Sequence, residues 1–175
     1  MIFATTGTHD QPMDRLLEWL DEWAAESGEE VVVQVMRTDM VPQKVKRVSC
    51  VEPQRWRTLV RQARVVVTHA GPASIFEVQE LGKTPVVVPR SAALGEHVDD
   101  HQERYAATLG PLVPTVSTRE ELWASLQTPP PSRDAHDRSA LQRTASLAAK
   151  ELTIGLARTA GIGRLARIAR ACCWR

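Results

Sequence analysis

The chain has 175 residues, of which 43% are apolar and 25% charged, with 22 Lys or Arg against 21 Asp or Glu. This length is that of one domain of ordinary size with a short appendage. A chain this long buries about two thirds of its unfolded surface and needs no disulfide or metal to fold. The sequence holds no apolar run of the ~18 residues that a transmembrane helix requires, which excludes such a helix.

The N-terminal segment MIFATTGTHD has neither a basic start nor a long apolar stretch, so we expect no signal peptide. The three cysteines, Cys50, Cys172 and Cys173, are odd in number and two of them are adjacent, which does not fit a disulfide framework. Both features are typical of a reducing compartment, and we expect a cytoplasmic protein.

The net charge of +1 averages two unlike parts of the chain. Residues 133–175 hold nine Lys or Arg against three Asp or Glu, a charge of +6, whereas residues 1–132 carry −5. A basic tail on an acidic body indicates an anionic surface or a protein partner. Nucleic acid is not expected as a partner, because the whole chain has only eight aromatic residues to interleave with its basic ones.

Short apolar runs alternate with helical segments through the first 127 residues. In chain order we expect strand Ile2–Thr5, helix Pro12–Glu26, strands Val31–Met36 and Val45–Val51, helix Pro53–Ala63, strand Val65–Thr68, helix Pro72–Leu81, strand Pro85–Val88, helix Asp99–Leu109, strand Leu112–Pro114 and helix Thr118–Leu126. Several of the strands are dense in Val, as is typical of a parallel sheet buried on both faces.

Local signals support these helices. The first carries apolar residues at positions i, i+3, i+4 and i+7, namely Met13, Leu16, Leu17 and Leu20. The third ends at Gly82, a natural C-cap, and the last opens with Ser117 and Glu120 in the spacing of a capping box.

This alternation predicts an α/β fold with a doubly wound, mostly parallel sheet. Ligands of such folds bind at the carboxyl ends of the strands. The functional loops are therefore expected at Thr6–Gln11, His69–Ser74 and Pro89–Gln102.

The three consecutive prolines 129–131 cannot continue a helix, so residues 128–132 are predicted to form a linker. We therefore divide the chain into an α/β domain at 1–127, this linker, and a basic helical tail at 133–175. Within the tail, Ile162–Cys173 places its apolar residues on one helical face and three arginines on the other.

The most informative segment is Val65–Glu77, in which a buried strand leads through Gly71 directly into a helix. Glycine permits close approach of a ligand, and the helix offers unpaired N–H groups with the positive end of its dipole. Ser74 in the first turn can reach a phosphate oxygen, and Glu77 on the same face can hold ribose hydroxyls. The alternative is an ordinary strand–helix turn with an exposed Glu.

The pattern His-Ala-Gly-x-x-Ser-x-x-Glu at 69–77, followed by Gly82, Pro85 and Pro89, resembles the C-terminal domain of family 28 glycosyltransferases. This is the donor-binding domain of the Rossmann-like GT-B fold. The resemblance implies that the loop and helix cradle the UDP of a nucleotide sugar, with Glu77 on the ribose. It also implies that Asp100 and Gln102, in an Asp-His-Gln element, face the donor sugar.

The start of the chain adds a second likeness. Residues 3–9, Phe-Ala-Thr-Thr-Gly-Thr-His, resemble the start of small family members that are donor-binding subunits of two-component transferases. Through Gly95–Gln102 the nearer likeness is to subunits of bacterial capsule or exopolysaccharide assembly. The resemblance covers residues 1–126 and implies a hexosyltransferase whose membrane-associated partner binds a lipid-linked acceptor. The alternative is a non-catalytic regulatory or scaffolding subunit of such a transferase.

The loop after the first strand has its own chemistry. Gly7 and Thr8 would form a second phosphate-facing loop beside Gly71. His9, near neutral at physiological pH, can donate to a phosphate or assist proton transfer as a catalytic group, although a loop histidine is often simply solvated. His69 can likewise touch the diphosphate, or be a half-buried structural histidine.

His97, Asp99, Asp100 and His101 are spaced closely enough to suggest a metal site. Two of the four side chains would diverge if a helix begins near Asp99. The GT-B class typically needs no catalytic metal, since helix dipoles and N–H groups neutralise the leaving phosphate. We therefore expect no metal and no cofactor, with a UDP-sugar as the substrate.

A GT-B enzyme closes a donor domain over an acceptor domain, and this sequence supplies one such domain. The resemblance therefore implies a second polypeptide. The basic tail would lie on the anionic cytoplasmic leaflet or dock onto that partner, which gives a peripheral location at the membrane. The alternative for the tail is a loosely ordered basic extension.

Overall fold

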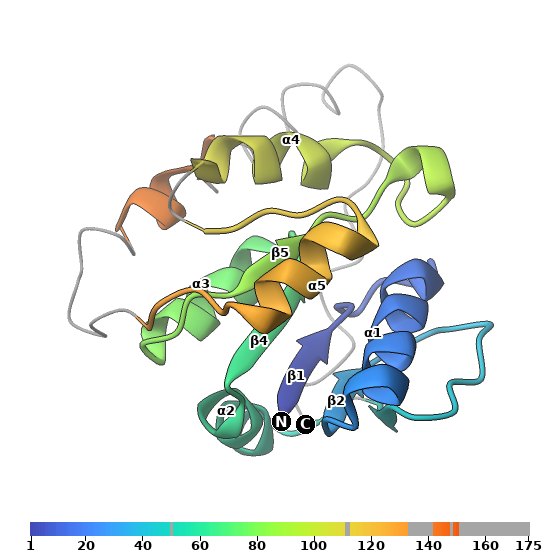
Figure 1. Ribbon diagram of the computed structural model, residues 1–175. Coiled ribbons are helices and arrows are strands. Elements are labelled where there is room, and N and C mark those ends of the chain that lie inside the picture. Colours follow the sequence, from blue (N-terminus) through green and yellow to red (C-terminus); the bar gives the residue numbers. More distant parts are fainter. Residues whose placement is uncertain (50, 111–112, 133–141, 148, 151–175) are drawn as a thin grey trace.

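The computed structural model describes residues 1–49, 51–110, 113–132, 142–147 and 149–150 (Figure 1). The expected tail at 133–175 lies mostly outside the described residues, including its amphipathic segment Ile162–Cys173. The α/β domain expected at 1–127 lies almost entirely within them. None of the helices in this described part is long and apolar enough to cross a membrane.

The centre of the fold is a five-stranded sheet in which every strand pairing is parallel. Its strands are β1 (Ile2–Thr5), β2 (Val31–Gln34), β3 (Lys46–Val48), β4 (Val65–His69) and β5 (Val86–Val88). They lie in the order β3-β2-β1-β4-β5, with Phe3 of β1 opposite Val32 on one side and Val66 on the other.

Helices cover both faces of this sheet. They are α1 (Asp14–Ser27), α2 (Pro53–Gln62), α3 (Pro72–Glu80), α4 (His101–Leu109) and α5 (Arg119–Gln127), with a short 3-10 turn, η1 (Ala92–Leu94). α1 and α5 lie together on one face, in front of the sheet in Figure 1, and α2, α3 and α4 pack on the other. The predicted doubly wound fold is confirmed.

Strand residues divide between the two faces by simple alternation. Ile2 and Ala4 of β1 pack with the leucines of α1 and α5, whereas Phe3 between them packs with Trp56 of α2. All three β1 side chains are fully buried, as a parallel sheet covered on both sides requires. This double burial explains why the strands are dense in Val rather than alternating between apolar and polar residues.

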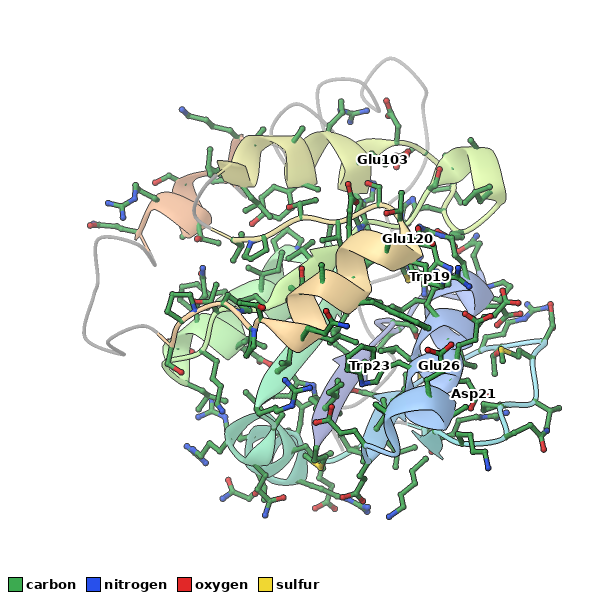
Figure 2. The ribbon with its side chains drawn as sticks, in the orientation of Figure 1. Trp19, Asp21, Trp23, Glu26, Glu103 and Glu120 are labelled. Carbon is green, nitrogen blue, oxygen red and sulfur yellow. The ribbon has the colours of Figure 1, made fainter. Side chains whose placement is uncertain are left out.

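Two tryptophans join the helices of the front layer. Trp23 of α1 is buried and meets Trp123 of α5 edge to face, with ring centroids 5.7 Å apart. The indole N–H of Trp123 donates to the main-chain oxygen of Trp19 at 3.1 Å. Figure 2 shows Trp19 and Trp23 between α1 and α5, so both of these α1 side chains lie at the junction of the two helices.

Three strands are shorter than predicted, and at the start of β3 the cause is a carboxylate that accepts main-chain N–H groups. The Asp21 side chain of α1 accepts the N–H groups of Gln43, Lys44 and Val45 at 2.7–3.0 Å. The N–H of Val45 is thereby unavailable to the sheet, and β3 begins at Lys46 rather than Val45. β2 ends at Gln34 rather than Met36, whose side chain is exposed. β3 ends at Val48 rather than Val51, and β5 begins at Val86 rather than Pro85.

The sixth strand expected at Leu112–Pro114 is a single bridge further along the chain. Thr115 pairs with Val87 of β5, through bonds from Val87 N–H to the oxygen of Pro114 and from Val116 N–H to the oxygen of Val87. Pro114 has no N–H to donate, so it takes part in this pairing only through its carbonyl oxygen, and the N–H comes from Val116. Leu112 lies outside the described residues.

The capping box of α5 is present one residue later than predicted. The Thr118 hydroxyl accepts the N–H of Glu121 at 3.2 Å, and the Glu121 carboxylate accepts the N–H groups of Ser117 and Thr118. Ser117 therefore lies one residue before the cap, and Glu120 is in the first turn without closing the box.

Thr118→Ala should lower the free energy of unfolding by about 1 kcal/mol, because α5 loses its N-cap acceptor. Urea denaturation measures the change. The matched control is Thr58→Ala in α2, where the exposed hydroxyl bonds the Gln54 carbonyl one turn back within the helix. The control should change stability by less than ~0.5 kcal/mol. Equal effects of the two substitutions would contradict the assigned cap.

Candidate functional site at the carboxyl edge of the sheet

The strand order reverses direction between β1 and β4, since β2 and β3 extend to one side and β5 to the other. Adjacent parallel strands whose crossover helices lie on opposite faces leave a crevice outside their carboxyl ends. α1 follows β1 on one face and α3 follows β4 on the other. The switch point therefore lies between the loops after β1 and β4, which is where the sequence predicts two of its functional loops.

A buried arginine, Arg90, joins the loops after β1 and β5. Its side chain is 1% exposed. Nη2 donates to the main-chain oxygen of Thr6 at 2.6 Å, and Nη1 donates to those of Gln11 and Glu96 at 2.7 Å each. Both loops thus contact the same guanidinium group. The prediction that they lie at a common edge of the sheet is confirmed.

The charge of Arg90 is solvated by protein dipoles rather than by a direct ion pair. Every side-chain bond found for it among the described residues ends on a main-chain carbonyl. Burial lowers the pKa of Arg90, and the nearby Glu96 carboxylate acts in the opposite direction. Glu96 is itself buried, bonded to Arg15 of α1 at 2.8 Å and to the N–H of Ser91 at 2.9 Å.

Sequence reasoning missed both Arg90 and Glu96. The signal available was the position of Arg90, a charged residue two places after a fully buried valine strand, at the edge where ligands bind. Burying a charge is costly unless it is paired or hydrogen-bonded, so an arginine there has a structural or binding task.

His69, the last residue of β4, fills the space between the loops after β1 and β4. A Cβ atom on Gly7 would lie 2.6 Å from its Nε2 atom, and one on Gly71 would lie 2.2 Å away. Gly7 also has a φ of +79°, which favours glycine. The close approach that Gly71 permits is therefore first of all that of the His69 ring.

The environment of His69 keeps its imidazole neutral. Burial and then the positive charge of Arg90 lower its pKa to about 3. Its Nδ1 atom is buried and has no hydrogen-bond partner among the described residues. His69 at physiological pH can therefore offer a ligand a neutral hydrogen-bonding group but no positive charge.

The start of α3 has the arrangement predicted for an anion site. Gly71 is its N-cap and Pro72 its first residue, and no side chain of the described protein caps it. Ser74 is half-buried in the first turn, and Glu77 is exposed one turn further along. The N–H groups of this turn are thus left for a ligand beside Gly7 and His69, apart from the one that Pro72 lacks.

Thr8 and His9 differ in their surroundings. Thr8 is exposed, whereas His9 is half-buried with its ring centroid 4.3 Å from that of His97. The Nε2 atoms of the two histidines are 3.0 Å apart. Burial, followed by Arg90 for His9 and by His101 for His97, lowers both pKa values, so both rings are neutral at physiological pH.

Two tautomers of His97 fit the surrounding contacts. With its proton on Nε2, His97 donates to His9, and its Nδ1 accepts the N–H of Asp99 at 3.3 Å. With its proton on Nδ1, His97 donates to Asp99 Oδ1 at 3.2 Å, and its Nε2 accepts from His9. This pairing was not predicted, because no local pattern links two residues that are 88 positions apart.

The loop before α4 corrects one expectation. Asp99 contacts the Nδ1 atoms of both His97 and His101, so these three side chains converge, and of the four acid and histidine residues only Asp100 turns away, to pair with Arg104. The divergence of two side chains was expected for a helix that begins near Asp99. That helix start was wrong, because α4 begins at His101 and residues 97–100 lie before it.

Gln102, predicted to face the donor sugar with Asp100, is 2% exposed. Its Oε1 atom accepts the main-chain N–H of Arg90 at 3.3 Å. Asp100 is exposed at the N-cap position of α4. The structure thus brings the loops after β1, β4 and β5 to one edge of the sheet, with Ser74 and Glu77 on the helix that follows β4, and the contacts of the predicted site residues with a ligand stay predictions.

The sheet order, the switch point and the helix start after β4 define a Rossmann-like α/β domain, the fold of GT-B glycosyltransferase donor domains. The sequence matches the glycosyltransferase family 28 C-terminal domain over residues 1–150. Because this match spans most of the chain, the chain belongs to that family.

Solved structures give the same architecture. A glycotransferase of kitacinnamycin is 23% identical with a TM-score of 0.55, covering 88% of this chain and 40% of that one. ALG13, solved by NMR, is 18% identical with a TM-score of 0.52, covering 79% of this chain and 91% of that one. CalG4, the calicheamicin glycosyltransferase, is 15% identical with a TM-score of 0.50, covering 91% and 41%.

These likenesses support the fold. The chain spans about two fifths of the length of the kitacinnamycin and calicheamicin enzymes and nearly all of ALG13. A search among curated proteins gives no match.

Gly7→Ala should destabilise the protein by about 1–3 kcal/mol more than Gly28→Ala. Both glycines have positive φ, +79° and +67°, so both substitutions carry the backbone cost, but only a Cβ at position 7 meets His69. Urea unfolding of the two variants isolates the contact. A second His69→Ala substitution should remove most of the difference, and an undiminished difference would contradict the packing.

His69 should remain neutral down to about pH 4 because its pKa is about 3. An unfolded histidine takes up a proton below about pH 6.5, so the unfolded state binds more protons between these values. The contribution of His69 to the free energy of unfolding is therefore fully present above pH 6.5. It is lost as the pH falls from 6.5 toward 3, by up to ~1.4 kcal/mol per pH unit.

Histidine ring resonances in an NMR pH titration measure this pKa directly, with His69→Gln identifying the resonance. The value for comparison is the midpoint near pH 6.5 of a histidine in an unstructured peptide. A midpoint for His69 above pH 5 would show that its ring is open to water rather than enclosed between the two glycine loops.

Proposed function

We propose that this chain is the donor-binding subunit of a two-component hexosyltransferase. It would take the hexose from a UDP-sugar and transfer it to a lipid-linked saccharide in bacterial capsule or exopolysaccharide assembly. The observation that carries the proposal is the N-terminus of α3, which has no side-chain cap in the described structure and opens at the switch point beside Gly7 and His69 in a family 28 domain.

The proposed nucleotide contacts divide by chemistry. The first-turn N–H groups of α3 and the Ser74 hydroxyl bind the diphosphate together with Gly7, Thr8 and His69. Glu77, an exposed carboxylate one turn along α3, accepts hydrogen bonds from the ribose hydroxyls. This division follows the helix axis, with the phosphates at the positive end of the dipole and the ribose beyond them.

The donor sugar would lie against the start of α4. Asp100 is exposed there and is free to exchange its Arg104 contact for sugar hydroxyls, whereas Gln102 supports the loop by holding Arg90. Gln102 would then meet the sugar through the part of its amide that Arg90 does not occupy.

Transfer would proceed by direct displacement at the anomeric carbon, with UDP as the leaving group. Charge that develops on the diphosphate is stabilised by N–H groups and the dipole of α3, which requires neither metal nor cofactor for this step. His9 is the proposed catalytic group of this chain, because a neutral half-buried imidazole can take up a proton. The partner subunit is the other source of a base.

The acceptor side belongs to a membrane-associated partner in this proposal. Four large apolar side chains are exposed in the described structure, in the loop after β2 and in the loop after β5, namely Met36, Val41, Leu94 and Val98. Both loops begin at carboxyl ends of strands, and we propose that these apolar side chains contact a second domain that closes over the donor.

The basic tail supplies a further reason for a peripheral membrane location. Residues 133–175 carry a charge of +6, which favours the anionic cytoplasmic leaflet or an acidic partner surface. The proposed location is therefore cytoplasmic, at the inner face of the plasma membrane.

Isothermal titration with UDP tests the donor site. The wild-type protein should bind UDP, and Glu77→Ala should weaken binding by about tenfold or more through loss of charge-assisted bonds to the ribose. Glu80→Ala is the matched control, an exposed acid at the other end of α3, and should bind like the wild type. No binding by the wild type, with or without its partner, would refute the proposal, as would equal affinities of the two variants.

Activity of the partner distinguishes this proposal from a regulatory or scaffolding role. The purified partner should transfer no sugar alone and should become active when this chain is added. Glu77→Ala should fail to restore transfer when the UDP-sugar concentration is below that needed to saturate the wild-type protein. Full activity of the partner without this chain would establish the non-catalytic role.

A further inference from the structure

We propose that His97, Asp99 and His101 form a binding site for a divalent transition metal ion of the Zn²⁺ type. The site lies in the loop between β5 and α4, and its three residues form the sequence His-Val-Asp-Asp-His with Asp99 at the centre. The ion would take no part in stabilising the leaving group, which is assigned to α3 in the proposed transfer reaction.

The distances between the ligand atoms suit one ion. One donor atom from each of the three side chains lies within 4.8 Å of those of the other two. His97 Nδ1 is 3.2 Å from Asp99 Oδ1, and His101 Nδ1 contacts the same oxygen. Bonds of about 2.0–2.1 Å in a tetrahedral zinc site place neighbouring ligand atoms a little over 3 Å apart, so the cluster needs only a small adjustment.

The two imidazole rings already face this point from different directions. The rings of His97 and His101 have centroids 4.4 Å apart and are inclined at 83°, which lets both Nδ1 atoms point toward Asp99 without the rings colliding. Two imidazoles and one carboxylate are typical ligands of Zn²⁺ and other divalent transition metal ions, whereas Mg²⁺ and Ca²⁺ prefer oxygen ligands alone. Three protein ligands leave a fourth position for water or another group.

A second layer of hydrogen bonds orients His97 for this task. In the tautomer that a metal requires, its Nε2–H donates to His9 Nε2 at 3.0 Å. A ligating histidine usually donates its other ring N–H in this way. The ion would then take the Nδ1 lone pair in place of the 3.3 Å bond from the Asp99 N–H. The chain of contacts therefore extends from the proposed ion to the loop after β1.

The loop that carries the cluster is held on both sides. The main-chain oxygen of Glu96, next to His97, accepts from Arg90, and the Glu96 carboxylate is bonded to Arg15. His101 is the first residue of α4, with its N–H bonded to Asp99 at 3.1 Å. Because the ends of the turn are fixed by these bonds, much of the ordering that a metal site requires is complete before the ion arrives.

Titration of the full chain with Co²⁺, followed by its visible absorption, tests the site. Metal is first removed with a chelator, and the parent carries Cys172→Ser and Cys173→Ser so that the two adjacent thiols do not compete. One equivalent of Co²⁺ should produce the absorption of a tetrahedral site, and Zn²⁺ should displace it. The ion should also raise the unfolding temperature, since it binds the folded state.

Asp99→Asn and Asp100→Asn form the matched pair for this experiment. Both remove one negative charge from exposed neighbouring positions, but only Asp99 contacts the two histidines. Asp99→Asn and His101→Ala should weaken Co²⁺ binding at least tenfold, and Asp100→Asn should leave it unchanged. His9→Ala should weaken it less, through loss of the bond to His97.

The contrary results are equally definite. Absence of a one-equivalent absorption change, or equal affinity of the Asp99 and Asp100 variants, would overturn the assignment. Because both side chains are exposed, both variants should fold, and circular dichroism verifies this. The UDP titration does not depend on metal binding, so the metal site and the donor site are tested by separate experiments.

Discussion

The buried guanidinium of Arg90 is the interaction on which the rest of the carboxyl edge depends. Carbonyl oxygens of Thr6, Gln11 and Glu96 converge on one small volume, and without a positive charge between them their dipoles would repel. Leaving a buried charge or its acceptors without partners costs several kcal/mol, so the arrangement is kept as a unit or lost as a unit. The loops after β1 and β5 thereby gain a fixed separation before any ligand is bound.

Most of the architecture follows from short-range features of the sequence. Valine-rich runs and the apolar spacing in Leu16, Leu17 and Leu20 give most ends of the strands and helices within a residue or two, because burial on both faces leaves few alternatives. One error has its cause in a distant side chain. β3 loses Val45 since Asp21, 24 positions earlier, accepts its N–H, and no local pattern contains that bond.

The candidate site was predictable to the level of loops but not of contacts. The edge where Gly7, Gly71 and the start of α3 meet follows from parallel topology alone. The pairing of His9 with His97 across 88 positions, and the burial of Arg90 among main-chain carbonyls, arise only when three loops come together. A glycine motif also does not reveal what approaches it, and here a protein side chain, His69, occupies the space beside both glycines.

The contact of His69 with two glycines also constrains how this protein can change during evolution. A substitution at Gly71 or Gly7 forces the imidazole to shift, because the first atom of any new side chain would overlap the ring. A smaller residue at position 69 removes this overlap at both positions. Position 7 still favours glycine for its φ of +79°. A substitution at position 71 therefore costs less stability after a change at position 69 than before it, so the order of the two mutations matters.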